Sequence, residues 1–323
     1  MAGEILDVAI IGSGPAALSA AIYVARAGLN VKVFEKQQIG GTLNQIAKIE
    51  NYPGFIGGGS SLASNMKDQA TAAGAKIEYG TCEEIGFAVT PTAEWPQCPK
   101  ADIPFEGRTS DEILYGKYPF YLLIDGERII AKAVIVATGS EPRPLGIATK
   151  TPVSYCAICD GTLYKDKKIA VVGGGNSALQ ESMYLAGIAQ SVTIFSHHEF
   201  KAEPYLIKKV ENQKNIELKQ KTEPTAEVLD GFDAVFAFIG KRPATSFLGK
   251  GFEGDKPGDE YECKLLNDEG YIIEKDGYTA IPGVFAAGDV CADTIKQVVT
   301  ATASGATAAL KAIDYIKQLN SQK

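Results

Sequence analysis

The strongest constraint on the fold of this 323-residue chain is a unit of strand, glycine turn, helix and strand at its beginning. Residues 6–11 (LDVAII) have the composition of a short buried strand, and the turn GSGPAA follows at 12–17. An alanine-rich stretch at 18–27 favours a helix, and a second apolar strand at 31–34 ends at Glu35. This order is typical of a dinucleotide-binding βαβ unit.

The residue types inside this unit suit the contacts that a dinucleotide needs. Gly12 permits the tight turn, Gly14 lets the backbone approach a pyrophosphate, and the small Ala17 lets helix and strand pack closely. The N-terminus of the helix offers unpaired N–H groups to phosphate. Glu35 stands where a carboxylate can bind both hydroxyls of a ribose. We therefore predict a dinucleotide site here, the alternative being a tight turn in an ordinary α/β domain.

The same pattern recurs in the middle of the chain. A strand at 168–172 is followed by the turn GGGNSA at 173–178, a helix at 179–186 and another strand at 192–195. Two such units in one chain predict two nucleotide-binding-type domains.

Between the two units lies the stretch YCAICDG at 155–161, a Cys-x-x-Cys pair followed directly by an aspartate. Such a pair can bind zinc, can be half of a thioredoxin-like redox motif, or can be a disulfide that a cofactor reduces. The chain's other cysteines and its histidines are Cys82, Cys98, Cys263, Cys291, His197 and His198. These do not combine with the pair into a four-ligand zinc site from local motifs. We therefore predict no metal and a redox role for the pair.

Composition narrows the class of protein further. Apolar residues make up 45% of the chain and charged residues 22%, which is a globular profile. The net charge of −7 argues against a nucleic-acid partner, which needs a basic surface. No apolar run approaches the roughly 18 residues of a membrane helix, and the first residues lack the basic segment of a signal peptide. We expect a cytoplasmic protein with no nucleic-acid or membrane partner.

From Val8 to about Ala309 the order and spacing of these motifs resemble the low-molecular-weight thioredoxin reductases, which are homodimeric flavoproteins. The matching pieces are GSGPAA at 12–17, GGTL at 40–43, IENYPG at 49–54, ATG at 137–139, SYCAICDG at 154–161, GGGNSA at 173–178, GVFAAGDV at 283–290 and KQVVT at 296–300. The resemblance implies bound FAD, thioredoxin or a thioredoxin-like protein as partner, and a homodimer.

The same resemblance implies the architecture and the flavin site. The expected fold class is α/β, with two nucleotide-binding domains of Rossmann-like, FAD/NAD(P)-type three-layer architecture, the second inserted in the first. The FAD domain would comprise residues 1–145 and 245–323, and the inserted redox-disulfide domain residues 146–244. The expected flavin-site residues are Gly12, Gly14, Ala17, Glu35, Lys36, Gly41, Leu43, Asn51, Gly139, Gly288, Asp289, Gln297 and Val298.

Cys156, Cys159 and Asp160 are the expected catalytic residues. Reducing a disulfide requires two electrons and two protons, and exchange with a partner needs one cysteine to attack and one to resolve. Asp160, beside Cys159, is placed to exchange a proton with a thiolate, or else to cap a helix. We expect Cys159 to meet the flavin and Cys156 to meet the partner.

One segment departs from the NADPH-using members of this family, in which a His-Arg-Arg-x-x-x-Arg segment holds the 2′-phosphate. Aligned on Phe200, the three arginine positions hold Ser196, His197 and Lys201. Arginine is always charged and grips phosphate as a bidentate fork, whereas histidine is mostly neutral at pH 7. A hydrogen bond to a charged group contributes about 1.5–3 kcal/mol. Losing two arginines would therefore weaken NADPH binding by about 10²–10⁴-fold.

Two length differences accompany this departure. The inserted domain is trimmed after Lys221, where family members carry a β-meander, and the FAD domain is longer than usual at 88–122, an added docking surface or a tolerated loop. In the missing arginines and the trimmed inserted domain, the chain resembles the ferredoxin-linked flavoprotein thioredoxin reductases. We therefore favour reduced ferredoxin as the electron donor. NADPH or NADH is the alternative donor, because GGGNSA still suits a pyrophosphate. A non-catalytic flavin-binding redox sensor is an alternative of another class.

Overall fold

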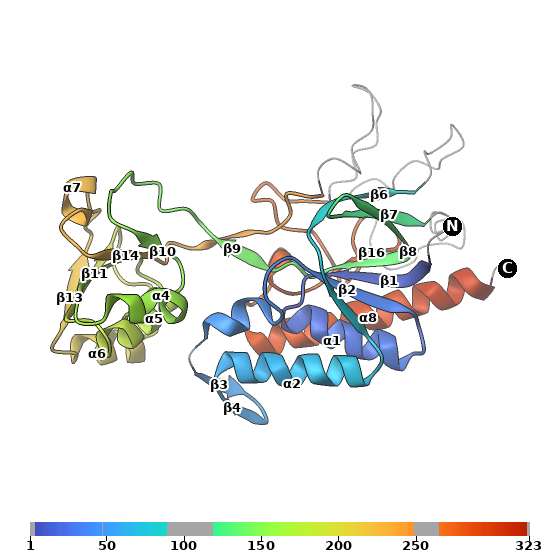
Figure 1. Ribbon diagram of the computed structural model, residues 1–323, viewed down its shortest axis with the longest axis horizontal. Helices are drawn as coiled ribbons and strands as arrows, with labels where there is room; N and C mark the ends of the chain where they lie inside the picture. The colour runs from blue at the N-terminus through green and yellow to red at the C-terminus, as the bar shows by residue number, and fades with distance from the viewer. Residues whose placement is uncertain (1–3, 47, 89–118, 249–264, 322–323) are drawn as a thin grey trace, which may run out of the picture. The chain divides into compact units, whose positions relative to one another are not determined.

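The computed structural model describes residues 4–46, 48–88, 119–248 and 265–321, so most of the extension at 88–122 lies outside the described residues. The chain divides into two compact units. The first comprises residues 1–44, 48–140 and 243–323, and the second comprises residues 45–47 and 141–242. Both are α/β units built on largely parallel sheets, as the sequence predicts (Figure 1).

The first unit contains most of the helices and strands. In chain order they are β1 (Ile5–Ile11), α1 (Pro15–Arg26), β2 (Val31–Glu35), η1 (Gly41–Gln45), β3 (Ile49–Tyr52), β4 (Phe55–Gly57), α2 (Gly59–Ala72), β5 (Lys76–Tyr79), β6 (Cys82–Phe87), β7 (Phe120–Ile124), β8 (Glu127–Val136), β16 (Val284–Ala286), η4 (Gly288–Val290) and α8 (Val298–Ser321). Helix α1 begins three residues before the expected 18–27, because Pro15 is compatible with the first helical position after Gly14.

The sheet of the first unit has seven strands, in the order β5-β2-β1-β8-β7-β6, with β16 also paired to β8. Strands β5, β2, β1, β8 and β16 run parallel, whereas β6 and β7 form an antiparallel extension. The first part of β8 pairs with β7 and its last part with β16. The parallel strands therefore end at one edge, where β1, β2 and β8 lead into the glycine turn, Glu35 and Gly139 respectively.

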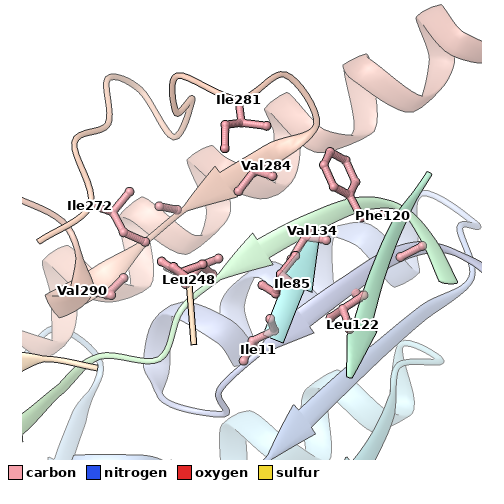
Figure 2. Close-up of a cluster of buried hydrophobic side chains, with 14 of the residues drawn as sticks. Ile11, Ile85, Phe120, Leu122, Val134, Leu248, Ile272, Ile281, Val284 and Val290 are labelled. Carbon is pink, nitrogen blue, oxygen red and sulfur yellow. The ribbon is translucent and has the colours of Figure 1, made fainter. Parts of the chain in front are cut away.

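Apolar side chains cover both faces of this sheet. On β1, Leu6, Ala9 and Ile11 belong to one buried cluster. Val8 and Ile10, whose side chains lie on the opposite face from Ala9 and Ile11, are fully buried as well. Figure 2 shows residues of β1, β7 and β8 in this cluster, together with Ile272, Val284 and Val290 from the C-terminal part of the unit. Packing of this second segment of chain onto the sheet fixes the position of η4, which follows β16.

The second unit is a five-stranded parallel sheet with short helices. Its elements are β10 (Val153–Ser154), α4 (Ala157–Asp160), η3 (Gly161–Tyr164), β11 (Lys168–Val172), α5 (Asn176–Ala186), β12 (Ser191–Ser196), α6 (Pro204–Glu211), β13 (Ile216–Gln220), α7 (Ala226–Leu229) and β14 (Ala234–Ala237). The strand order is β10-β14-β11-β12-β13. Residues 221–233 are all described, and α7 is the one helix or strand within them.

The chain enters the second unit through β9 (Ser140–Pro142) and leaves it through β15 (Lys241–Pro243), and these two strands pair with each other. None of the helices among the described residues is long and apolar enough to span a membrane.

Candidate active site

A disulfide joins Cys156 and Cys159 at the start of α4 in the second unit. Cys156 is the residue that precedes the helix, and its Sγ accepts a hydrogen bond of 3.2 Å from the backbone N–H of Cys159. Cys159 is exposed and Cys156 half-buried. An N–H directed at a sulfur favours the thiolate over the thiol, so this geometry would stabilise negative charge on Cys156 once the disulfide is opened.

Asp160, the last residue of α4, is held by Ser154 from the adjacent strand β10. The Ser154 hydroxyl donates a hydrogen bond of 2.7 Å to Asp160 Oδ2. Asp160 directly precedes η3, but its side chain makes no capping hydrogen bond to that helix. The Asp160 carboxylate is thus held by a residue of β10. It does not cap η3, so the structure does not support the capping role that the sequence left open.

The first glycine turn lies at the end of β1, where it forms an open cradle. Gly12 has a φ of +95°, and a Cβ atom there would lie 2.4 Å from the carbonyl oxygen of Ala137, so this position requires glycine. Gly14 precedes α1 and leaves the helix N-terminus without a side-chain cap, and a Cβ atom added to it would meet no protein atom within 4 Å. Gly41 approaches Gly14 from the next turn. Ala17 is fully buried behind this turn.

Glu35, at the end of β2, is buried with an exposed fraction of 8%. Its Oε2 accepts a hydrogen bond of 2.6 Å from Ser13, and its Oε1 accepts one of 2.8 Å from the backbone N–H of Gln37. A carboxylate has about four acceptor positions, so two remain for the hydroxyls of a ribose. Ser13, which the sequence pattern did not single out, is therefore the residue that orients this carboxylate from within the glycine turn.

The remaining flavin-site candidates lie on several elements of the first unit. Asn51 of β3 donates a hydrogen bond of 3.0 Å to Gln297, directly before Val298 begins α8. Gly288 and Asp289 form the start of η4. Leu43 is buried in η1, Lys36 is exposed after β2, and Gly139 follows β8 with no atom within 4 Å of a Cβ position.

At the second glycine turn, Gly174 packs against the end of β12 and the segment that follows it. A Cβ atom on Gly174 would lie 2.2 Å from Ser196 Oγ, and Ser196 itself is buried. The backbone N–H of Lys201 donates to the carbonyl of Gly174 at 2.9 Å. Two exposed residues between Ser196 and Lys201 pair with residues that follow β13: His197 Nδ1 lies 3.2 Å from a carboxylate oxygen of Glu223, and Glu199 lies 2.7 Å from Lys221 Nζ.

The two free cysteines among the described residues are Cys82 and Cys291. Burial raises the pKa of the Cys82 thiol to about 12, and burial together with Glu274 and Asp289 raises the pKa of Cys291. A thiol that stays protonated is a poor nucleophile, so neither cysteine competes with the disulfide. No group of three or more metal-ligating side chains occurs within the described ranges.

Comparison with known proteins identifies the family to which this chain is similar. The family described as "Pyridine nucleotide-disulphide oxidoreductase" matches residues 6–305. Thioredoxin reductase of Ureaplasma parvum is 34% identical over 98% of this chain and 99% of its own length. That of Listeria monocytogenes is 32% identical over 98% and 95%. The solved thioredoxin reductase of Lactococcus lactis has a TM-score of 0.77 at 27% identity and covers 97% of this chain and 99% of its own. That of T. acidophilum has a TM-score of 0.75 at 26%, covering 97% and 99%.

Proteins of this family bind FAD, and the first unit fits that cofactor. Its glycine turn is open at Gly14, the N-terminus of α1 has no side-chain cap, and Glu35 retains free acceptor positions. Ser140 Oγ, next to Gly139, is buried and without a hydrogen-bond partner in the described part of the chain. The chain is an FAD-binding oxidoreductase of the pyridine nucleotide-disulphide oxidoreductase family, and within that family it belongs to the low-molecular-weight thioredoxin reductases.

Proposed function

We propose that this enzyme passes electrons from bound FAD through the Cys156–Cys159 disulfide to the disulfide of thioredoxin or a thioredoxin-like protein. The observation that carries the proposal is the disulfide itself, closed at the start of α4 with an N–H directed at Cys156 and with a carboxylate fixed beside Cys159. The names of the relatives agree with it.

In this proposal the first unit holds the flavin through residues of its two chain segments. They are Gly12, Gly14, Ala17, Glu35, Lys36, Gly41, Leu43, Asn51, Gly139, Gly288, Asp289, Gln297 and Val298. FAD, when bound, supplies the two electrons that open the disulfide. The FAD domain then comprises residues 1–145 and 245–323 with residues 146–244 inserted. The compact units, which divide after residues 140 and 242, support this arrangement.

The dithiol reduces the partner by two exchange steps. The Cys156 thiolate attacks one sulfur of the partner disulfide, and the partner's other sulfur leaves as a thiolate and takes up a proton. Cys159 then attacks Cys156 Sγ, which restores the enzyme disulfide and releases the partner's first sulfur, which takes up a second proton. The two protons come from the enzyme dithiol, and Asp160 takes up and returns a proton of the cysteine thiols.

We further propose that reduced ferredoxin, rather than a pyridine nucleotide, is the electron donor. At the end of β12, Ser196 is packed against Gly174, and two carboxylates, Glu199 and Glu223, stand in the neighbouring turns. A 2′-phosphate brought to this edge would meet no arginine fork, and the nearby Lys221 and His197 are already paired with these carboxylates. The short connection through α7 adds no further strand that could frame a nucleotide.

The second candidate donor is NADPH or NADH. The turn at the N-terminus of α5 favours it, because Gly175 has no atom within 4 Å of a Cβ position and the helix has no side-chain cap. The homodimer that the resemblance implies and the cytoplasmic location expected from the sequence belong to the same proposal. A dithiol that must be restored in every cycle suits a reducing compartment.

Cysteine substitution tests the thioredoxin reductase activity. Cys156→Ser and Cys159→Ser should each keep FAD bound and abolish catalytic reduction of thioredoxin, because exchange needs both sulfurs. Cys82→Ser is the matched control, since its thiol is half-buried in β6, and it should keep full activity. Catalytic turnover by Cys156→Ser would contradict the mechanism. Bound FAD without turnover of thioredoxin by the wild type would favour a redox sensor.

A further inference from the structure

Ser154 has no role in the proposed exchange steps, yet the structure places it at the centre of the active site. It is the last residue of β10, where pairing with Phe236 of β14 fixes its backbone. Its side chain is buried, with an exposed fraction of 7%. A buried hydroxyl in a fixed strand loses little further freedom when it forms a hydrogen bond, so it can hold a partner in one orientation.

The Ser154 hydroxyl has one proton and two nearby acceptors. Asp160 Oδ2 lies 2.7 Å from Ser154 Oγ, whereas the carbonyl oxygen of Cys156 lies 3.3 Å away. The shorter contact to an ionised acceptor is the stronger one, so the proton points to Asp160. In turn Ser154 Oγ accepts a hydrogen bond of 3.1 Å from the N–H of Cys156. The hydroxyl thus connects the backbone of the first cysteine to the carboxylate that follows the second.

Asp160 depends on this contact. Ser154 is the hydrogen-bond partner of the Asp160 carboxylate in the described part of the chain, and the side chain does not cap η3. A carboxylate that exchanges protons with a thiol must lie within reach of it in a defined orientation. Without the hydroxyl, the Asp160 side chain would be free to rotate away from the dithiol.

We propose that Ser154 is a positioning residue, whose hydroxyl holds the Asp160 carboxylate in place for proton exchange with the Cys156–Cys159 dithiol. This inference rests on the proposed function. Ser154 would affect the rate of thioredoxin reduction only by orienting Asp160. It predicts that the rate loss caused by removing the hydroxyl disappears once the carboxylate has been removed.

A double-mutant cycle tests this prediction. The FAD-loaded enzyme is reduced anaerobically with a stoichiometric amount of dithionite and mixed with oxidised thioredoxin, and the thiols formed are trapped by alkylation after acid quench. Ser154→Ala should slow thioredoxin reduction about tenfold, and Asp160→Asn about 10²-fold. The double variant should be no slower than Asp160→Asn alone, and Ser154→Thr, which keeps the hydroxyl, should recover most of the wild-type rate.

The outcomes separate this inference from the proposed function. An equal rate loss from Ser154→Ala in the wild-type and Asp160→Asn backgrounds would overturn it, since the serine would then act only through the Cys156 backbone. An undiminished rate in Ser154→Ala would overturn it as well. Failure of the wild-type enzyme to reduce thioredoxin would instead overturn the proposed function.

Discussion

Asn51 and Gln297, 246 residues apart in the chain, are joined by a hydrogen bond of 3.0 Å from Asn51 Nδ2 to Gln297 Oε1. The contact connects β3 to the start of α8 and so joins the two chain segments of the first unit at the proposed flavin site. Both side chains are exposed, so the hydrogen bond alone contributes little to the stability of the protein. We interpret it as an arrangement of two polar side chains for the cofactor.

Substitution of either residue should weaken FAD binding. Asn51→Ala and Gln297→Ala should each raise the Kd for FAD about fivefold, since a lost hydrogen bond corresponds to about 1 kcal/mol. The Kd is measured by titrating apoprotein with FAD and following flavin fluorescence. Asn65→Ala, exposed on α2, is the control and should not change it. Unchanged affinity in both variants would remove these residues from the flavin site.

Replacing the two glycines of the first turn by alanine should affect different properties, the stability of the apoprotein at Gly12 and the affinity for FAD at Gly14. At Gly12 an added Cβ meets backbone at a positive φ, so Gly12→Ala should destabilise the apoprotein by about 3 kcal/mol. At Gly14 the φ is −69° and the space is open, so Gly14→Ala should leave the Tm of the apoprotein unchanged. The added methyl group should nevertheless lower FAD affinity at least about tenfold, because it occupies the path of a pyrophosphate. Equal FAD affinity in Gly14→Ala and wild type would contradict this placement.

Glu181 in α5 makes the stability of the second unit depend on pH. Burial raises its pKa to about 7, against an opposing effect of Lys241. A carboxyl group whose pKa is higher in the folded than in the unfolded protein stabilises the fold. This contribution is complete at pH values below the pKa of the unfolded state, and it is lost as the pH rises through the pKa of the folded state. Glu181→Gln should therefore stabilise the protein at pH 8 by on the order of 2 kcal/mol.

Most of this gain should be gone at pH 5, where wild-type Glu181 is protonated in the folded protein. Urea unfolding of the two proteins at both pH values provides the comparison. An equal stability difference at pH 8 and pH 5 would show that Glu181 does not titrate as its burial requires.

Local patterns predicted much of the fold. The strand expected at 168–172 is β11, and the strands expected at 6–11 and 31–34 differ from β1 and β2 by one residue at one end. Buried parallel strands are apolar runs bounded by glycine turns, so their limits can be read from sequence. Helix α5 begins three residues before the expected 179–186, because Asn176 and Ser177, though polar, already belong to its first turn.

The contacts within the candidate site were less accessible to sequence reasoning. The Asn51–Gln297 hydrogen bond depends on how two distant segments pack, and no local pattern specifies it. Ser154 and Asp160 are only six residues apart, but they meet across a corner between a strand and a helix, where no fixed periodicity applies. Ser13 had a detectable signal, a hydroxyl between the two glycines of the turn, although its partner Glu35 could be identified only in the structure.

The most direct test of the central claim is anaerobic bleaching of the flavin absorbance in the FAD-loaded enzyme, followed after mixing with reduced ferredoxin, NADPH or NADH, with dithionite as the positive control. Rapid bleaching by ferredoxin and none by either pyridine nucleotide is the predicted result, and subsequent addition of oxidised thioredoxin should restore the absorbance. Rapid bleaching by NADPH or NADH would contradict the account, because a nucleotide would then bind and react at an edge of the second unit that carries Ser196, Glu199 and Glu223 instead of arginines.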